Sequence, residues 1–288
     1  MADPILSPRP RRGLRRGALV AALCASAFLL SACATAPDAE KTRDSISQVT
    51  KQPEKSAEAE ELQQYDASLH PDPIAEPRAC TPYLTITARG TNERPGNQLL
   101  TPVARLIGES RPDEVDTIDL DYPADTDVRL GGTRAVRLLI DTLDVQAEAC
   151  PGQRFILLGY SQGALAIGDA LTAPGERLVG ERSGELHTDT AQRILAVVLY
   201  GDPRFLGTEP YDAGDFDPKM HGVIPRPAGS LQSFDSRVRD YCVADDIVCQ
   251  GGPELNEEGH VAYFSNGMQQ DGAAFVIERL PEPFAGTE

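Results

Sequence analysis

The chain has 288 residues, 41% of them hydrophobic, and a formal net charge of -17 at pH 7. This size and composition are typical of a globular protein with one sizeable core or two small ones. Nucleic-acid binding normally depends on clustered Lys and Arg, and an acidic chain repels phosphate backbones. We therefore expect no nucleic-acid partner.

The first 33 residues predict an export signal. Several arginines precede an apolar run from Gly17 to Ala32, as in secretory signals. The run has about 16 residues, whereas a membrane-spanning helix needs roughly 20, so an uncleaved anchor is only an alternative. Residues 30–33, LSAC, are similar to a bacterial lipobox, and we expect Cys33 to carry a lipid, with plain secretion as the other alternative. Each reading places the protein outside the cytoplasm, either at the membrane or released.

Residues 34–78 are rich in Glu, Lys, Ser, Gln and Pro and contain few large aliphatic side chains. Such a segment cannot bury enough apolar surface to offset the entropy of the chain. We expect a disordered acidic tether here, followed by one folded domain over residues 79–288.

Beyond the tether, short apolar runs alternate with amphipathic stretches. The runs predict five strands, at residues 82–88, 115–122, 154–160, 194–200 and 238–244. Their nearly continuous apolar character is typical of a parallel sheet covered on both faces. Between the second and third, residues 131–150 carry Val136, Leu139 and Leu143 at helical spacing and predict a helix that packs on the sheet. The pattern predicts a single three-layer α/β domain.

Two polar segments interrupt this rhythm. Residues 172–192 are rich in Gly and Glu, and residues 206–230 form a long stretch rich in Gly and Pro. Neither carries the apolar stripe of a lid helix, so we expect no true lid.

The candidate nucleophile is Ser161, in the sequence GYSQG at residues 159–163. The pentapeptide alone is common, but here it follows an apolar strand and precedes ALAIGDAL, a good helix start. Strand, sharp turn and helix are the setting of a nucleophile elbow. An ordinary turn serine is the alternative.

A nucleophilic serine needs a histidine base and an acid that orients it. The chain has four histidines: one lies in the tether, one in each polar segment, and His260 follows the last predicted strand. Only His260 comes after an acid at the end of the last predicted strand, and it therefore gives the order Ser, acid, His that is typical of α/β-hydrolases. A histidine at the start of a surface helix is the alternative reading of His260.

The acid is chosen by position, because carboxylates are abundant. Asp246 lies at the end of the last predicted strand, within CVADDIVC. Asp202, which ends another strand, and the neighbouring Asp245 are its rivals. Donors for an oxyanion are also required. We expect them from the backbone of Gln162 and from Thr91 in the loop after the first strand, which is otherwise a simple turn.

Six cysteines are present, of which Cys24 lies in the signal and Cys33 at the lipobox. An even number remains, as expected for disulfides in an exported protein. Three pairings are open, although the separation of seven residues between the last two favours a local clip and leaves the first two to pair. The four are Cys80, Cys150, Cys242 and Cys249.

Together these motifs resemble the cutinase family, which includes acetylxylan esterases. The resemblance covers residues 80–280 and is carried by ARGTNE, ACP, GYSQGA, YGDPRF, CVADDIVC and GHVAYF. It implies a five-stranded parallel sheet without a true lid and the two disulfides Cys80 to Cys150 and Cys242 to Cys249. It also implies a triad of Ser161, Asp246 and His260 with Thr91 and Gln162 as oxyanion hole.

The chain departs from fungal cutinases just before the histidine. Those enzymes carry an apolar loop there, whereas this chain has QGGPELNEEG at residues 250–259. Insertion of that loop into a wax is not expected, so ester hydrolysis is a firmer prediction than action on cutin.

The sequence therefore predicts a serine esterase that needs no metal or cofactor and acts as a monomer on an ester substrate. A cell-envelope acyltransferase or carbohydrate acetyl esterase with the same acyl-enzyme is one alternative. A cell-surface binding protein that retains the fold without catalysis is another.

Overall fold

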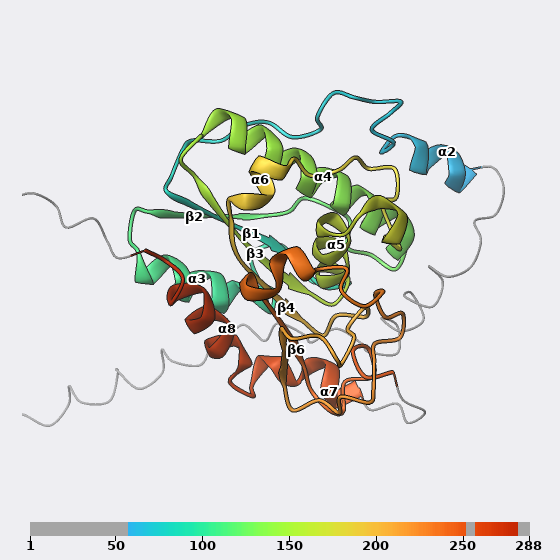
Figure 1. Cartoon of the computed structure of the whole chain (residues 1–288), viewed down its shortest axis with the longest axis vertical. Helices are drawn as coiled ribbons and strands as arrows, with labels where there is room; N and C mark the ends of the chain where they lie inside the picture. The colour runs from blue at the N-terminus through green and yellow to red at the C-terminus, as the bar shows by residue number, and fades with distance from the viewer. Residues whose placement is uncertain (1–56, 252–256, 282–288) are drawn as a thin grey trace, which may run out of the picture. The chain divides into compact units, whose positions relative to one another are not determined.

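The computed structural model describes residues 57–251 and 257–281 (Figure 1). The export signal, Cys33 and most of the expected tether lie outside these residues. Within them, no helix is long and apolar enough to cross a lipid bilayer. The described chain forms a parallel sheet with helices on both faces, as the sequence predicts.

The sheet has six strands, in the order β2-β1-β3-β4-β6-β5. All the pairings are parallel. The strand bounds are β1 Tyr83–Ala88, β2 Val115–Asp119, β3 Arg154–Tyr160, β4 Ile194–Tyr200, β5 Asp212–Gly214 and β6 Val238–Cys242.

The prediction of five strands is wrong by one, because β5 lies in a segment that was expected to be a loop. Its three residues, Asp-Ala-Gly, have no apolar run, and they are held by pairing with the edge of β6. Gly214 has a φ of +107°, and a Cβ there would lie 2.1 Å from the carbonyl oxygen of Cys242. The close backbone approach therefore needs glycine.

The helices form two layers (Figure 1). Helices α4, α5 and α6 cover one face of the sheet, and α3 and α8 cover the other. The longer helices are α3 Leu100–Ser110, α4 Val128–Ala149, α5 Gln162–Leu171 and α8 Met268–Ile277. The short ones are α2 Ala57–Gln63, α6 Thr188–Gln192 and α7 Glu257–Val261, with 3-10 turns η1 Pro174–Glu176, η2 Gln232–Arg237 and η3 Ala262–Phe264.

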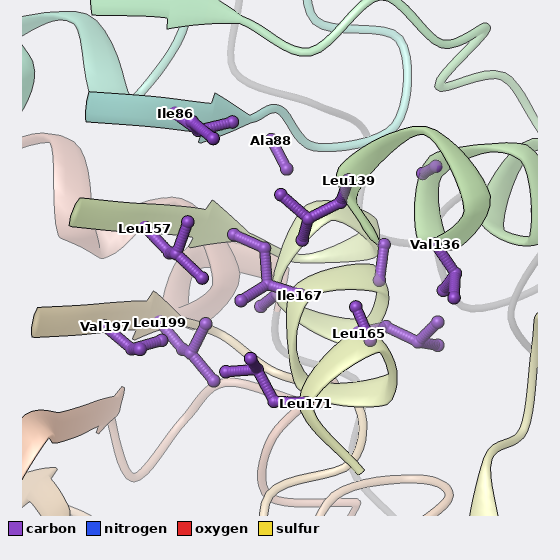
Figure 2. Close-up of a cluster of buried hydrophobic side chains, with 14 of the residues drawn as sticks. Ile86, Ala88, Val136, Leu139, Leu157, Leu165, Ile167, Leu171, Val197 and Leu199 are labelled. Atoms are coloured by element: carbon purple, nitrogen blue, oxygen red, sulfur yellow. The ribbon is translucent and has the colours of Figure 1, made fainter. Parts of the chain in front are cut away.

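Two hydrophobic cores explain why the central strands are apolar throughout. In β3, Leu157 belongs to the core under α4 and α5, whereas Ile156 and Leu158 belong to the core under α3 and α8. Figure 2 shows the first core, where Leu157 and Leu199 face Ile167 and Leu171 of α5. Each large aliphatic side chain buried in this way stabilises the fold by about 1.5–3 kcal/mol.

The structure corrects the extent of the expected tether, because residues 57–78 are folded. After α2, residues 64–78 run along α4, and we call them the strap. The backbone N–H of Ile74 donates to Asp141 of α4 at 2.8 Å, and that of Arg78 donates to Gln146 at 2.9 Å. Composition could not predict this, because polar side chains of α4 rather than an apolar core hold the strap.

Candidate active site

Ser161 lies in a sharp turn between β3 and α5 and is buried. Its φ of +53° is rare for a residue other than glycine and stores strain. A Cβ at position 163 would lie 1.9 Å from the carbonyl oxygen of Ala88, and one at position 159 would lie 2.8 Å from the Cα of Ala164. Both glycines are therefore required for α5 to pack against the sheet.

His260 and Asp246 lie beside this serine, although they are far from it in sequence. The Nε2 atom of His260 is 3.0 Å from the Oγ of Ser161. The Nδ1 atom is 2.9 Å and 3.0 Å from the two carboxylate oxygens of Asp246. All three side chains are buried, and we call them the Ser-His-Asp chain.

The Asp246 carboxylate is also held from its other sides. Its Oδ1 accepts a hydrogen bond from the backbone N–H of Val248 at 2.8 Å, and its Oδ2 accepts one from the hydroxyl of Tyr263 at 2.7 Å. The rivals are placed elsewhere: Asp245 is exposed, and Asp202 pairs with Arg226. Of the three carboxylates, only Asp246 contacts His260.

The other three histidines do not approach Ser161. His70 is exposed, and His187 lies 3.5 Å from Asp144 with most of its side chain in solvent. His221 accepts a hydrogen bond from the backbone N–H of Gly207. Within the described residues, no group of three or more His, Cys, Asp or Glu side chains is arranged to hold a metal ion.

Two further glycines let the backbone close tightly around His260. A Cβ at position 201 would lie 2.9 Å from the Cε1 of His260 and 2.9 Å from the Oδ2 of Asp246. At position 259 it would lie 2.1 Å from the carbonyl carbon of Asp245. The ring of Tyr160 stacks on the imidazole at 5.2 Å, and its hydroxyl donates to the backbone oxygen of His260. The histidine is therefore fixed by packing on several sides.

Thr91 and Gln162 lie next to each other at the edge of the sheet where Ser161 lies. Both are buried, and the Thr91 hydroxyl donates to the Oε1 of Gln162 at 3.4 Å. Gln162 is the first residue of α5, where backbone N–H groups have no partner within the helix. These are the two residues that the sequence predicts as oxyanion donors.

Glu93 is a residue whose role the sequence analysis missed. Its carboxylate accepts hydrogen bonds from the backbone N–H groups of Gly90 and Leu99, at 2.7 Å and 2.8 Å. Burial raises its pKa, and these two donors oppose the rise. The glutamate thereby fixes the loop that carries Thr91. It lies within the quoted motif ARGTNE, but only the structure shows what it binds.

The two disulfides have the pairing that the resemblance implies. Cys80 is bonded to Cys150, with Cα atoms 5.6 Å apart, and Cys242 is bonded to Cys249, with Cα atoms 5.9 Å apart. The second bond closes the turn that carries Asp246. The first joins the end of the strap to the end of α4.

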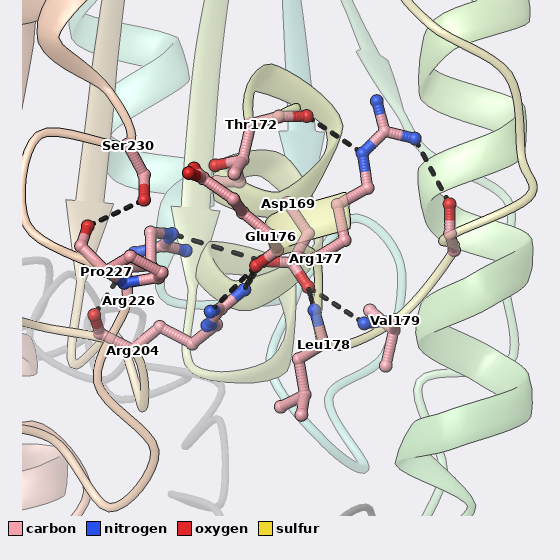
Figure 3. A network of polar contacts seen from close by, with 12 residues as sticks. Asp169, Thr172, Glu176, Arg177, Leu178, Val179, Arg204, Arg226, Pro227 and Ser230 are labelled. Carbon is pink, nitrogen blue, oxygen red and sulfur yellow. Dashed lines mark hydrogen bonds and ion pairs between the residues drawn. The ribbon is translucent and has the colours of Figure 1, made fainter. Parts of the chain in front are cut away.

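Figure 3 shows a second buried network of charge, around Asp169, Arg204 and Arg226. Arg204 pairs with Asp169 and also donates to the backbone oxygen of Glu176 at 3.1 Å. Asp169 accepts backbone hydrogen bonds at 2.8 Å and 2.9 Å from two successive residues after η1. The network thus joins α5 to the segments that follow η1 and β4. We call it the ion cluster; its members are Asp169, Asp202, Arg204, Arg226 and Asp240.

Asp240 of β6 is the least typical member of the ion cluster. Burial raises its pKa well above the usual value, and the nearby charge of Asp202 raises it further, while Arg226 opposes the rise. The ion cluster and the Ser-His-Asp chain are connected along the backbone. Gly201 packs on His260, and the next residue, Asp202, is a member of the ion cluster.

Comparison with known proteins agrees with this fold. The sequence model of the Cutinase family matches residues 79–280. The chain therefore belongs to the cutinase family, a family of carboxylic ester hydrolases.

Individual relatives are similar over most of the domain. A protein named Cutinase from Kineococcus radiotolerans is 32% identical over 200 residues, which cover 68% of this chain and 61% of that relative. The Carboxylesterase Culp1 of Mycobacterium tuberculosis is 26% identical over 219 residues, covering 74% of this chain and 85% of the relative. The catalytic core domain of acetyl xylan esterase from Trichoderma reesei has a TM-score of 0.61 and 24% identity, over 70% of this chain and 100% of that structure. This last likeness supports the fold.

Proposed function

We propose that the protein is an extracytoplasmic serine esterase that hydrolyses carboxylic esters through an acyl-enzyme formed on Ser161. The observation that carries the proposal is the unbroken Ser-His-Asp chain, with 3.0 Å between Ser161 and His260 and 2.9 Å between His260 and Asp246. Membership of the cutinase family and the names of its relatives support the same reaction class.

In the first step, Nε2 of His260 takes the proton of the Ser161 hydroxyl as the oxygen attacks the carbonyl carbon of the ester. Asp246 holds Nδ1–H and stabilises the imidazolium that forms. His260 then gives this proton to the leaving alcohol, and the acyl group stays on Ser161. A water molecule, deprotonated by the same histidine, releases the acid and restores the serine.

Negative charge develops on the carbonyl oxygen during both steps, and preorganised donors lower the barrier most effectively. We assign this role to the backbone N–H of Gln162 at the start of α5 and to Thr91 by its backbone N–H and hydroxyl. Glu93 supports them, because it accepts the N–H of Gly90 and so fixes the backbone just before Thr91.

The surface next to the site favours polar substrates. Asn92, Asp245 and Glu258 are exposed, and each lies within two residues of a site residue in sequence. Asp125 is also exposed, and its carboxylate and the Gln162 amide both lie within 4 Å of where a Cβ at position 131 would stand. The large hydrophobic side chains exposed in the described part of the chain are Leu69 and Ile74, both in the strap. We therefore propose short acyl esters of hydrophilic alcohols as better substrates than waxes or long-chain polyesters.

Export is part of the proposal, because the two disulfides fit an oxidising compartment. We further propose that Cys33 is lipidated and tethers the domain to the membrane through residues 34–56. Mass spectrometry of the mature N-terminus tests this: a diacylglyceryl cysteine at residue 33 supports it, and an unmodified N-terminus contradicts it.

The test of the reaction uses purified protein with p-nitrophenyl esters from acetate to palmitate, alongside acetylated xylan. We expect hydrolysis of the short esters, and loss of it in a folded Ser161→Ala variant. Absence of hydrolysis by the folded protein supports the alternative of a binding protein. Addition of an alcohol separates hydrolysis from acyl transfer, because a transferase forms the new ester instead of the free acid.

A further inference from the structure

Tyr263 is a buried side chain next to the proposed triad that the sequence analysis did not consider. It lies in η3, three residues after His260, and its hydroxyl turns back toward the loop that carries Asp246. One short stretch of chain thus places both the imidazole and the phenol against the same carboxylate.

The hydroxyl of Tyr263 has a defined direction of hydrogen bonding. It accepts a hydrogen bond from the backbone N–H of Val243 at 3.3 Å and donates one to the Oδ2 of Asp246 at 2.7 Å. Burial raises the pKa of Tyr263 well above its usual value, and the charge of Asp246 raises it further. The phenol therefore keeps its proton around neutral pH, and it remains a donor.

The ring cannot easily turn away. It packs edge-on against Tyr160 at 6.2 Å and against Tyr200 at 5.9 Å. The hydroxyl also lies 3.4 Å from the Sγ of Cys249, in the disulfide that closes the Asp246 turn. Packing thus holds the donor at one place relative to the carboxylate.

The two oxygens of Asp246 are supported differently. The Oδ1 atom is bonded within its own turn by the N–H of Val248, whereas Oδ2 receives only the Tyr263 hydroxyl and the shared Nδ1 of His260 among the described residues. Without the phenol, the carboxylate is held by the protein backbone at one oxygen alone. Rotation about its Cβ–Cγ bond can then carry Oδ2 away from the Nδ1 of His260.

We propose that Tyr263 is a positioning residue that holds the Asp246 carboxylate against the Nδ1 of His260 and withdraws part of its negative charge. This inference rests on the proposed function. A buried phenol requires a hydrogen-bond partner in any protein. A purely structural role of this kind would not affect the chemistry of His260, whereas a positioning role would.

The test is the Tyr263→Phe variant, with Tyr200→Phe as the matched control. Tyr200 is a buried tyrosine of the same aromatic group, but its hydroxyl donates to the backbone oxygen of Met268. We expect Tyr263→Phe to lower kcat about tenfold, the cost of one charge-assisted hydrogen bond, with little change in KM. Active sites are counted by fluorophosphonate labelling, so that misfolded protein does not contribute.

The pH profile separates positioning from mere packing. Loss of one hydrogen-bond donor leaves more negative charge on the Asp246 carboxylate. The carboxylate then attracts the protonated form of His260 more strongly, and this form persists to a higher pH. The acid limb of the kcat/KM profile should move up by about half a pH unit in Tyr263→Phe and stay in place in Tyr200→Phe. A profile that does not move, with only a lower Tm, overturns the proposal.

A double variant gives an answer that does not depend on the profile. If Tyr263 acts through Asp246, the Tyr263→Phe change lowers kcat much less in an Asp246→Asn background than in the wild type. Equal effects in both backgrounds overturn the inference. Failure of the wild type to hydrolyse esters would instead count against the proposed function, so the two failures are distinguishable.

Discussion

The Ser-His-Asp chain and the ion cluster are neighbouring buried networks, but they differ in how completely their polar atoms are bonded. Both ring nitrogens of His260 and both oxygens of Asp246 have partners. In the ion cluster, Nε and Nη2 of Arg226, Nε of Arg204 and Oδ1 of Asp240 make no hydrogen bond within the described part of the chain.

This difference indicates what each network is for. In the proposed mechanism a proton passes between Ser161 and His260, which requires fixed distances, and both oxygens of the Asp246 carboxylate are held accordingly. The ion cluster joins α5 to the segment after β4, to Arg226 between β5 and β6, and to β6 itself. Removing one partner of a buried ion pair is costly because it leaves the other charge buried without compensation. Loss of a member should therefore cost activity in the first network and folding free energy in the second.

The largest effect should come from Asp246→Asn. An amide in place of the carboxylate favours the wrong tautomer of His260, so we expect kcat to fall by about 10⁴-fold with little change in Tm. Initial rates on p-nitrophenyl acetate and a thermal melt measure the two quantities. Asp245→Asn, which changes the exposed neighbour, is the control and should keep normal rates. Near-normal kcat in Asp246→Asn would remove this residue from the mechanism.

For the ion cluster, Arg226→Met is the informative change. It leaves Asp202 and Asp240 buried beside each other without their cation, and should lower the free energy of unfolding by about 3–5 kcal/mol. Urea unfolding measures this loss, and kcat per labelled active site should be retained. Arg105→Met is the control, because Arg105 is exposed and pairs with the equally exposed Glu109, and such surface pairs contribute about 1 kcal/mol or less. Equal losses in both variants would contradict the comparison.

Removal of the Cys242 to Cys249 disulfide should affect both properties. Closure of so short a loop stabilises the fold by about 2–3 kcal/mol on the chain-entropy model, and the loop carries Asp246. We expect the Cys242→Ala and Cys249→Ala pair to lower both Tm and kcat. The matched pair at Cys80 and Cys150 should lower Tm alone. A folded protein with full activity after loss of the Cys242 to Cys249 bond would show that Asp246 does not depend on it.

The smallest effect is the pH dependence of stability around the ion cluster. Burial raises the pKa of Asp212 in β5 to about 8, and the charges of Glu209 and Asp202 add to the rise. The folded carboxyl keeps its proton where the unfolded one, with a pKa near 4, has lost it. The free energy of unfolding should therefore decrease as pH rises from about 4 to about 8, with a shallow slope because solvent screens this partly exposed carboxyl.

Urea unfolding at several pH values measures this slope. Asp212→Asn should flatten it, because the amide does not titrate. An exposed carboxylate such as Asp127 is the control, and its change to Asn should leave the slope as it is. A slope that Asp212→Asn leaves unchanged would contradict the expectation that this carboxyl keeps its proton in the folded protein.

The central strands were predictable because a strand that is buried on both faces has apolar side chains at successive positions, as in β3 and β4. The proposed triad was predictable from chain order and from the short motifs around Ser161 and His260. The short strand β5 was not, because its pairing depends on an edge supplied by β6. The strap was missed for a similar reason: the partners of Ile74 and Arg78 are side chains of α4.

The role of Tyr263 had a weak signal in the sequence. A residue three positions after a helical histidine lies on the same face, so GHVAYF places an aromatic side chain beside His260. The identity of its acceptor could not be predicted, because the Asp246 turn approaches only in three dimensions. Glu93 was hidden in the same way, since backbone N–H groups leave no trace in sequence.

The bond between Cys80 and Cys150 also decides how the domain responds to mechanical load. A pulling force on the N-terminal side reaches the strap first and can peel its few hydrogen bonds from α4. It then meets a covalent bond at the end of α4, at the edge of the sheet where the strands begin. Ser161 lies at the opposite edge, where the strands end. An enzyme held by its N-terminus could thus be dragged against its surroundings while the geometry at the reacting serine stays unloaded.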